Sequence, residues 1–386
     1  DVANREDLSL VYTPGVAKVS EVIAREPELA HRLTMKGNSV AIVTDGSAVL
    51  GLGNIGPEGA LPVMEGKSVL FKKFAGIDAI PLCLSVQETE QIINSVLAAA
   101  PSFGGINLED IAAPKCFEIE EKLKNLLDIQ VFHDDQHGTA IVTLAGLINA
   151  LKVVDRRLEN VKVVMSGAGA AGAAITKILL SAGAKDIIVC DSKGAIARDQ
   201  PLGTPYKKWL AENTNESCRH GSLKEVIAGA DVFIGVSAPG LLNREDILKM
   251  AAKPVIFALA NPEPEVNPEE IYDIAGVIAT GRSDYPNQIT NVLAFPGVFR
   301  GALDCHARTI NDEMCLAAAW ALGEFITGDQ LSAENIIPSV FNEGVSPAVA
   351  RAVAESAKFT GVSRRYLYEE ANKGGLLYST IKDTMT

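Results

Sequence analysis

A glycine-rich turn between a strand pattern and a helix pattern constrains this chain most. It lies in VKVVMSGAGAAGAAITKILLSAGAKDIIVCDSKG (161–194) and follows GxGxxG. In that motif the glycines permit a tight turn, close approach to a pyrophosphate, and close packing of helix on strand. The helix N-terminus then offers amide donors to phosphates. We therefore predict a dinucleotide site at six residues, Gly167, Ala168, Gly169, Ala170, Ala171 and Gly172. The alternative is a Gly/Ala-rich turn without a ligand.

The acid at the end of the next strand bears on which nicotinamide cofactor fits. Asp191 closes that strand and can accept hydrogen bonds from the ribose hydroxyls, which favours NAD. Ser192 and Lys193 follow directly and could instead accept the 2′-phosphate of NADP. We predict NAD, with NADP possible.

Apolar runs and helical patterns alternate along most of the chain, which is typical of α/β folds with parallel sheets. We expect two domains, residues 1–136 and a Rossmann-like doubly wound domain over 137–386, the latter ending in a mainly helical tail (298–386) with breaks near Pro338 and Pro347. Helical spacing appears in 88–100 and 138–151. Strand-like runs occur at 39–44, 77–84, 106–111, 128–135, 231–237, 254–262 and 276–281.

Two acidic pairs, Glu109–Asp110 and Asp134–Asp135, come where strands are expected to end. Converging carboxylates are the ligands that Mg²⁺ and Mn²⁺ prefer. One alternative is that an aspartate caps the helix that starts near 138. Another is a zinc site, because His133 and His137 have the spacing of a zinc-binding helix; it needs one continuous helix through both.

Charge and hydropathy argue against a nucleic-acid-binding protein and against a membrane-spanning protein. The net charge is −13, with no Lys/Arg-rich run, so we expect no nucleic-acid partner. The sequence shows no signal-peptide pattern and no apolar run long enough to span a membrane, so we predict a cytoplasmic protein. Six widely spaced cysteines without CxxC indicate reduced thiols. The chain starts at Asp1 without methionine, so we expect missing N-terminal sequence.

The order of several motifs resembles that of malic enzymes over nearly the whole chain, in their short bacterial form. The motifs are YTPGVA, TDGSAVLGLGNIG, PVMEGK, LEDI, FHDDQHGTA, GAGAAG, ANP and TNVLAFPGVFRGAL. The resemblance implies metal-dependent oxidative decarboxylation of L-malate to pyruvate and CO₂ with NAD or NADP. It also implies a homodimer or larger homo-oligomer.

The resemblance also implies residue roles. Tyr12 corresponds to the general acid and Lys67 to the general base, which contacts substrate. The metal ligands would be Glu109, Asp110 and Asp135, with Asp134 an acidic neighbour that supports catalysis. Asn261 would lie near substrate and nicotinamide, and Asn291 near substrate. In this scheme residues 1–136 carry acid, base and two ligands, and 132–140 is the hinge between domains.

Two points follow for the chemistry. A lysine base must be neutral near pH 7–8, so we expect partial burial and a nearby cation to lower the pKa of Lys67 from about 10.4. Larger family members also carry an arginine before the LGLG loop, where this chain has Ser47, Ala48 and Val49. The carboxylate clamp is then absent or supplied from elsewhere, with the backbone amides of 53–56 and the two asparagines as candidates.

Two other functions stay open. One is a two-domain amino-acid or hydroxy-acid dehydrogenase whose lysine works without metal. The other is a nucleotide-binding sensor without turnover. Metal dependence separates the first from a malic enzyme, and malate-dependent reduction of NAD would exclude the second.

Overall fold

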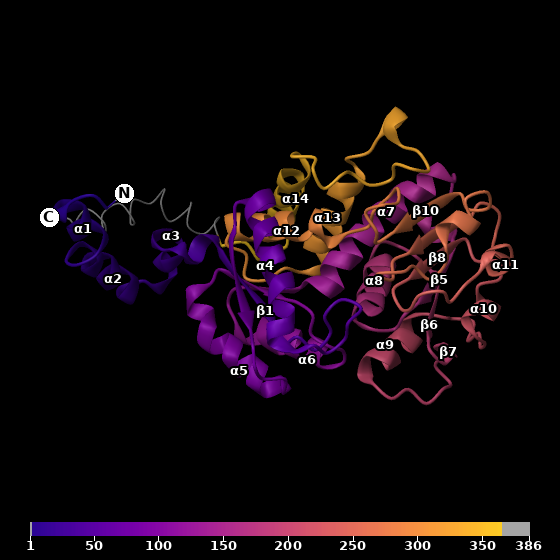
Figure 1. Ribbon diagram of the computed structural model, residues 1–386, viewed down its shortest axis with the longest axis horizontal. Helices are drawn as coiled ribbons and strands as arrows, with labels where there is room; N and C mark the ends of the chain where they lie inside the picture. The colour runs from indigo at the N-terminus through magenta and orange to yellow at the C-terminus, as the bar shows by residue number, and fades with distance from the viewer. Residues whose placement is uncertain (1, 365–386) are drawn as a thin grey trace.

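The computed structural model describes residues 2–364 and contains two sheets (Figure 1). The first has four parallel strands in the order β2-β1-β3-β4. The strands are β1 (Ser39–Thr44), β2 (Asp78–Cys83), β3 (Gly105–Leu108) and β4 (Gln130–His133). The main helices between them are α4 (Gly56–Ala75), α5 (Thr89–Ala99) and α6 (Lys115–Leu126).

Both faces of the first sheet are covered, which is why the run SVAIVT is continuously apolar up to its ends. Val40 and Ile42 cluster with the apolar side of α4. Ala41 and Val43 point to the opposite face, as alternate residues of a strand must, and cluster with α5 and α6.

The second sheet has six strands in the order β10-β9-β8-β5-β6-β7, parallel except for the short β7. The strands are β5 (Lys162–Ser166), β6 (Asp186–Asp191), β7 (Gly194–Ala195), β8 (Val232–Gly235), β9 (Val255–Ala258) and β10 (Val277–Thr280). The helices around it are α7 (Thr139–Val153), α8 (Ala170–Ser181), α9 (Pro205–Asn213), α10 (Leu223–Val226) and α11 (Arg244–Ile247). The predicted α/β class with a Rossmann-like domain is confirmed.

Most predicted strands are shorter than expected, and at two of them this matters for the acidic pairs. β3 ends at Leu108 and β4 at His133, so both acidic pairs lie just beyond the strands. After β4 the chain forms one turn of π-helix, η4 (Asp134–Gly138), before α7 begins. Every residue of α7 from Ala140 to Leu151 is buried, which fits its apolar sequence on all sides.

The last helices connect the two sheets. They are α12 (Phe295–Asp304), α13 (Asp312–Gly323) and α14 (Val345–Phe359). α12 packs on α4, where Phe299 lies 5.4 Å from Phe71 between ring centroids, and α13 packs on α7. Pro338 lies in the predicted break, whereas Pro347 lies in the first turn of α14, where its missing N–H costs no helical hydrogen bond. The predicted tail beyond 364 lies outside the described residues.

The N-terminal helices form an arm that extends away from both sheets (Figure 1). The arm consists of α1 (Arg5–Val11), α2 (Gly15–Arg25) and the short α3 (Ala30–Leu33). No residue of the three is buried, and Leu10 and Val11 are more than half exposed. Among residues 2–364, no helix is both long and apolar enough to cross a membrane.

Candidate active site

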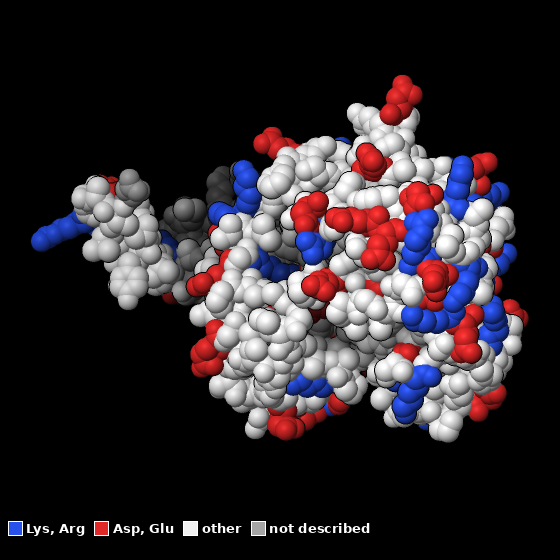
Figure 2. All heavy atoms as spheres, turned by 45° about the vertical axis from the view of Figure 1, so that its right-hand side comes forward, with Lys and Arg blue, Asp and Glu red and all other residues white. Residues whose placement is uncertain are grey.

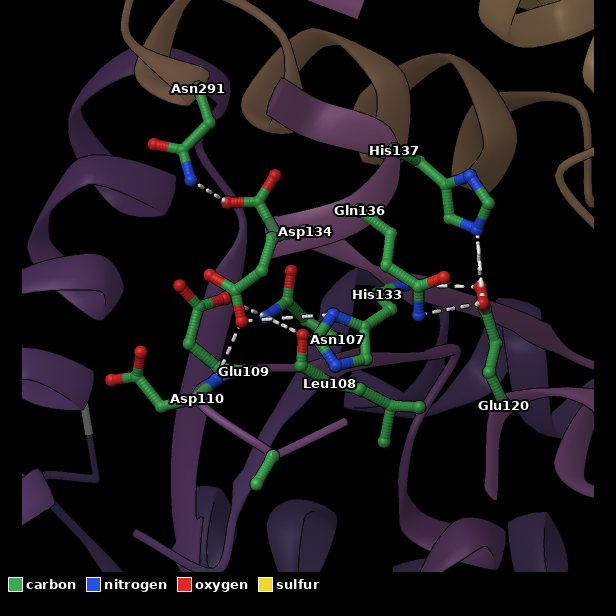
Figure 3. Close-up of polar contacts among 12 residues, drawn as sticks. Asn107, Leu108, Glu109, Asp110, Glu120, His133, Asp134, Gln136, His137 and Asn291 are labelled. Atoms are coloured by element: carbon green, nitrogen blue, oxygen red, sulfur yellow. Dashed lines mark hydrogen bonds and ion pairs between the residues drawn. The ribbon is translucent and has the colours of Figure 1, made fainter. Parts of the chain in front are cut away.

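Three carboxylates converge where β3 and β4 end (Figure 3). Glu109 and Asp110 follow β3, and Asp135 lies in η4 after β4. Because these strands are parallel neighbours, their carboxyl ends meet at one edge of the sheet. One oxygen of each side chain lies within 4.8 Å of the others. The Asp110 amide donates to Asp135 Oδ2 at 2.8 Å, which holds the two segments together.

The pKa values of these three acids are raised well above their ordinary range. Burial raises the pKa of Glu109 to about 7 and that of Asp110 to about 8, and repulsion from Asp135 adds to both shifts. Burial also raises the pKa of Asp135 to about 6. Asp110 Oδ2 is buried and has no hydrogen-bond partner among residues 2–364. Three converging carboxylates, one of them with an unpaired oxygen, form a set of ligands that a hard divalent cation can bind.

Lys67 reaches this cluster from the middle of α4. Its Nζ lies 2.7 Å from Glu109 Oε2 and forms a second ion pair with Asp134, and the side chain is 7% exposed. The amine also lies 4.3 Å from the centre of the Phe295 ring. Burial by itself would lower the pKa of Lys67, but the two carboxylates outweigh it and raise that pKa. The expected lowering depends on a nearby cation and so stays a prediction; by themselves, the two anions beside the amine keep it protonated.

Asp134 is the most buried acid of the group, at 0% exposure. Its Oδ2 accepts from Lys67 and, at 2.5 Å, from Asn291 Nδ2 (Figure 3). A Cβ on Gly138 would lie 1.8 Å from Asp134 Oδ1, so the glycine of the GTA motif makes room for this carboxylate. Neither aspartate caps α7, whose N-cap is Gly138, so the capping alternative is wrong.

The two histidines do not share a helix face. β4 ends at His133, and η4 follows it. The His137 Nε2 lies 2.8 Å from Glu120 Oε1, whereas His133 Nδ1 lies 3.7 Å from Asp135. This geometry contradicts the zinc alternative, which required one helix through both histidines.

The sequence did not single out Glu120 or Asn107. Glu120 is buried in α6 and accepts from the His133 amide as well as from His137, so it fixes the start of η4. Asn107 donates to Glu109 Oε2 at 2.9 Å. A polar residue inside an otherwise apolar strand, one position before LEDI, was the available signal for Asn107.

The loop that carries Ser47, Ala48 and Val49 is anchored on the first domain. Ser47 Oγ donates to Asp45 Oδ1 at 2.6 Å and accepts from the Ala112 amide at 2.9 Å. Asp45 forms an ion pair with Lys115. Gly51 lies against the Asn261 carbonyl, to which a Cβ there would approach within 3.0 Å. Asn261, just beyond β9, therefore faces this loop from the second domain.

The glycine turn lines a pocket of about 600 Å³, together with Asp191 and Lys207. Gly167 has φ 117°, and a Cβ there would lie 2.7 Å from the Val236 carbonyl oxygen. A Cβ on Gly172 would lie 1.9 Å from the Gly167 carbonyl oxygen. Ala170 and Ala171 begin α8, so its N-terminus opens at the turn. The pattern therefore formed the predicted strand, turn and helix.

Asp191 is already engaged. Its Oδ2 accepts from Lys207 Nζ at 2.7 Å, and its Oδ1 accepts from the Lys193 amide at 2.7 Å. Burial opposes the ionised form, but these donors lower the pKa of Asp191, so the carboxylate is ionised at neutral pH. A basic neighbour of this acid was anticipated at Lys193; Lys207 was not.

Tyr12 does not meet Lys67 within one chain. It lies between α1 and α2 and is 67% exposed. Figure 1 shows both helices well away from α4, which carries Lys67. The structure thus brings together Lys67, Glu109, Asp110, Asp134, Asp135 and Asn291, but it leaves the predicted acid on the arm.

Comparison with known proteins decides the family. A model of the malic enzyme N-terminal domain matches residues 2–124, and one of the malic enzyme NAD-binding domain matches residues 136–358. The chain belongs to the malic enzyme family. The predicted family is thereby confirmed, and so is the prediction of a nicotinamide-dependent enzyme.

Individual malic enzymes are similar over most of their length. The NAD-dependent malic enzyme of Geobacillus stearothermophilus is 62% identical over 364 residues, which cover 94% of this chain and 76% of that protein. The bifunctional malic/malolactic enzyme of Bacillus subtilis is 56% identical over 366 residues, covering 94% and 89%. The crystal structure of malic enzyme from Pyrococcus horikoshii superposes with a TM-score of 0.91 at 47% identity, covering 100% and 93%.

Proposed function

We propose that this malic enzyme catalyses the metal-dependent oxidative decarboxylation of L-malate to pyruvate and CO₂, with hydride transfer to NAD. The observation that carries the proposal is the position of Lys67. A single buried amine contacts Glu109 of the three-carboxylate cluster and Asp134 beside it. A proton acceptor next to a cation site is what a hydroxy acid needs for oxidation and loss of CO₂.

Glu109, Asp110 and Asp135 would hold Mg²⁺ or Mn²⁺, as their oxygens and the orphaned Asp110 Oδ2 support. When bound, the ion supplies Lewis-acid polarisation of the substrate's oxygen. The acids themselves must be ionised to serve as ligands, and their raised pKa values make that ionisation depend on pH near neutrality.

Lys67 would accept the proton of the malate C2 hydroxyl. Its raised pKa follows from Glu109 and Asp134, so charge neutralisation at Glu109 removes one of the two groups that keep the amine protonated. Asp134 keeps the amine in position, and Asn291 fixes Asp134 in turn. Lys67, Asn261 and Asn291 are our candidates for contact with malate.

NAD is our preferred cofactor because Asp191 ends β6 beside the glycine turn and is held ionised. A carboxylate there accepts from ribose hydroxyls and repels a 2′-phosphate. The ion pair with Lys207 works in the opposite direction, since it neutralises part of that charge. We keep NADP as the second choice.

Tyr12 would protonate C3 of the pyruvate enolate, which requires a partner. Since the arm holds Tyr12 away from Lys67 of its own chain, we propose a homodimer in which the arm of one copy completes the site of the other. The exposed apolar side chains of the arm support this, because Leu8, Leu10 and Val11 are at least half exposed among the described residues 2–364.

We further propose that the two domains divide near residue 136, with η4 as the hinge. In that division α4 carries the base, and the segment after β9 carries Asn261, so domain closure would bring substrate and nicotinamide groups together.

A cytoplasmic location also stays a prediction, as do malate and pyruvate as the partners. On the face drawn in Figure 2, basic and acidic side chains are interspersed.

The test measures the near-ultraviolet absorbance of reduced nicotinamide with L-malate and Mn²⁺, for NAD and NADP, each with and without EDTA. Reduction that EDTA abolishes, with pyruvate as product, is the expected result. Reduction that persists in EDTA would support the metal-free dehydrogenase. No reduction with either cofactor would contradict both proposals and leave the nucleotide-binding sensor.

A further inference from the structure

A second group of metal-ligating side chains lies far along the sequence from the carboxylate cluster. It consists of Asp199, Cys218 and His220 in the loops on either side of α9. Cys218 Sγ lies 3.3 Å from Asp199 Oδ1, and His220 Nε2 lies 3.1 Å from Asp199 Oδ2. One ligand atom of each residue lies within 4.8 Å of the others. Three potential ligands thus already converge on one point.

The loop that carries two of them is held by a buried asparagine. Asn215 is 2% exposed, and its Nδ2 donates to the carbonyls of Ile196 at 2.9 Å and Arg219 at 2.8 Å. Its Oδ1 accepts from the Arg219 amide at 2.8 Å. The Cys218 amide donates to the Asn215 carbonyl at 2.9 Å, and Cys218 takes a left-handed φ of 52°. Hydrogen bonds of Asn215 therefore hold the loop before α9 and the loop after it together, and they fix the positions of the three potential ligands.

The second nitrogen of the histidine is also engaged. Gln200 Nε2 and His220 Nδ1 lie 2.9 Å apart. With the amide group of Gln200 turned over, its oxygen would accept from Nδ1–H and leave Nε2 as a free ligand, which is the usual arrangement behind a metal-bound histidine. The Asp199 carboxylate contacts both the Cys218 thiol and the His220 imidazole. His220 therefore is not paired with the thiol as the base that activates a nucleophile would be.

We propose that Asp199, Cys218 and His220 form a binding site for a borderline-soft divalent cation of the Zn²⁺ type. Sulfur, nitrogen and oxygen ligands together favour zinc over Mg²⁺, which prefers oxygen alone. Asp199 and His220 are about half exposed, at 58% and 49%, so water can occupy a fourth position. The site shares no residue with the carboxylate cluster and does not depend on the proposed reaction.

The loops that carry this site lie next to the dinucleotide pocket. Gly194 and Ser222 line the dinucleotide pocket, and the Ala195 amide donates to the Gly221 carbonyl at 2.9 Å, directly after His220. A cation here would therefore stabilise the loops beside the dinucleotide pocket.

The test uses Co²⁺ as a spectroscopic substitute for zinc. The full chain, reduced and kept in excess Mg²⁺ to occupy the carboxylate cluster, is titrated with Co²⁺ while the thiolate-to-cobalt charge-transfer absorption is recorded. We expect about one equivalent per chain to give this band, and added Zn²⁺ to remove it. Cys218→Ser should abolish the band, whereas Cys83→Ser, at the other half-buried thiol, should leave it.

His220→Gln and Asp199→Asn keep the size of each side chain and lie at the surface, so folding should survive; circular dichroism checks this. Each should weaken Co²⁺ binding by at least about tenfold, the loss seen even for outer-shell partners. Absence of a charge-transfer band in the unsubstituted protein, or its persistence in Cys218→Ser, would overturn the proposal. So would unchanged affinity in both His220→Gln and Asp199→Asn.

Discussion

The amine of Lys67 lies 2.7 Å from a carboxylate oxygen of Glu109, although the two residues are 42 positions apart in the sequence. Both side chains are almost fully buried, at 7% and 6% exposure. In such an environment an unpaired charge is costly, so each group determines the ionisation of the other. Lys67 and the carboxylate cluster are therefore one electrostatic unit.

Removal of the amine tests its role as base. We expect Lys67→Ala to lower kcat by about 10²–10⁴, the usual contribution of a general base, and to leave NAD affinity unchanged. Steady-state kinetics and NAD titration measure the two effects. The control is Lys72→Ala one and a half turns along α4, where the side chain is 63% exposed. Unchanged turnover in Lys67→Ala would disprove the assignment.

Removal of one carboxylate tests the cation site. Asp135→Ala should raise the Mn²⁺ concentration for half-maximal activity sharply, because a ligand is lost and the Asp110 amide loses its acceptor. The measurement is activity against free Mn²⁺. Asp78→Ala, an exposed acid at the start of β2, should behave as wild type. Full activity of Asp135→Ala in trace Mn²⁺ would argue against ligation.

The pH dependence of metal binding follows from the raised pKa values. A carboxyl group whose pKa is raised on folding stabilises the folded state while it is protonated. As the pH rises, this stability begins to fall at the pKa of the unfolded chain, about 4. For Asp110 the loss is complete only above the folded-state pKa of about 8. Cations bind the ionised form, so the increase in Tm with Mn²⁺ should be larger at about pH 8 than at about pH 5.5.

Differential scanning calorimetry at both pH values, with and without Mn²⁺, measures this increase. In Asp135→Asn the increase should be small at either pH, because a ligand is missing. An equal increase at both pH values in the unsubstituted protein would show that the cluster is already ionised at the lower pH.

The acid at the end of β6 tests cofactor choice. Asp191→Ala should weaken NAD more than NADP, since the ribose acceptor is lost and Lys207 is released from its ion pair. KM for both cofactors is the measurement. Asp186→Ala, an exposed acid at the start of the same strand, is the matched control. If both cofactors lose affinity equally, Asp191 does not discriminate between them.

Mixing two inactive variants tests the shared site. Tyr12→Phe and Lys67→Ala each remove one group, and co-expression yields mixed dimers with one complete site if the arm acts between copies. Random pairing in a symmetric dimer then restores about a quarter of the unsubstituted activity. Each variant expressed alone gives the baseline. No recovery in mixed dimers that are shown to form would place Tyr12 and Lys67 in the same chain's site.

Local pattern was sufficient for the strands and for the dinucleotide turn. SVAIVT became β1, and the glycine turn became the junction of β5 and α8, because periodicity and backbone freedom act over a few residues. The two acidic pairs were also visible in sequence, as was their place after apolar runs. Their convergence followed from the parallel pairing of β3 and β4, which the α/β pattern anticipates.

Other properties depend on contacts between distant residues. Only tertiary structure surrounds Lys67 with two carboxylates, which raise its pKa although burial by itself would lower it. Likewise, only tertiary structure pairs Asp191 with Lys207 and places Tyr12 on an arm away from Lys67. The sequence determines which groups are present and which elements carry them. The fold decides their neighbours, and a charge in a protein interior takes its behaviour from its neighbours.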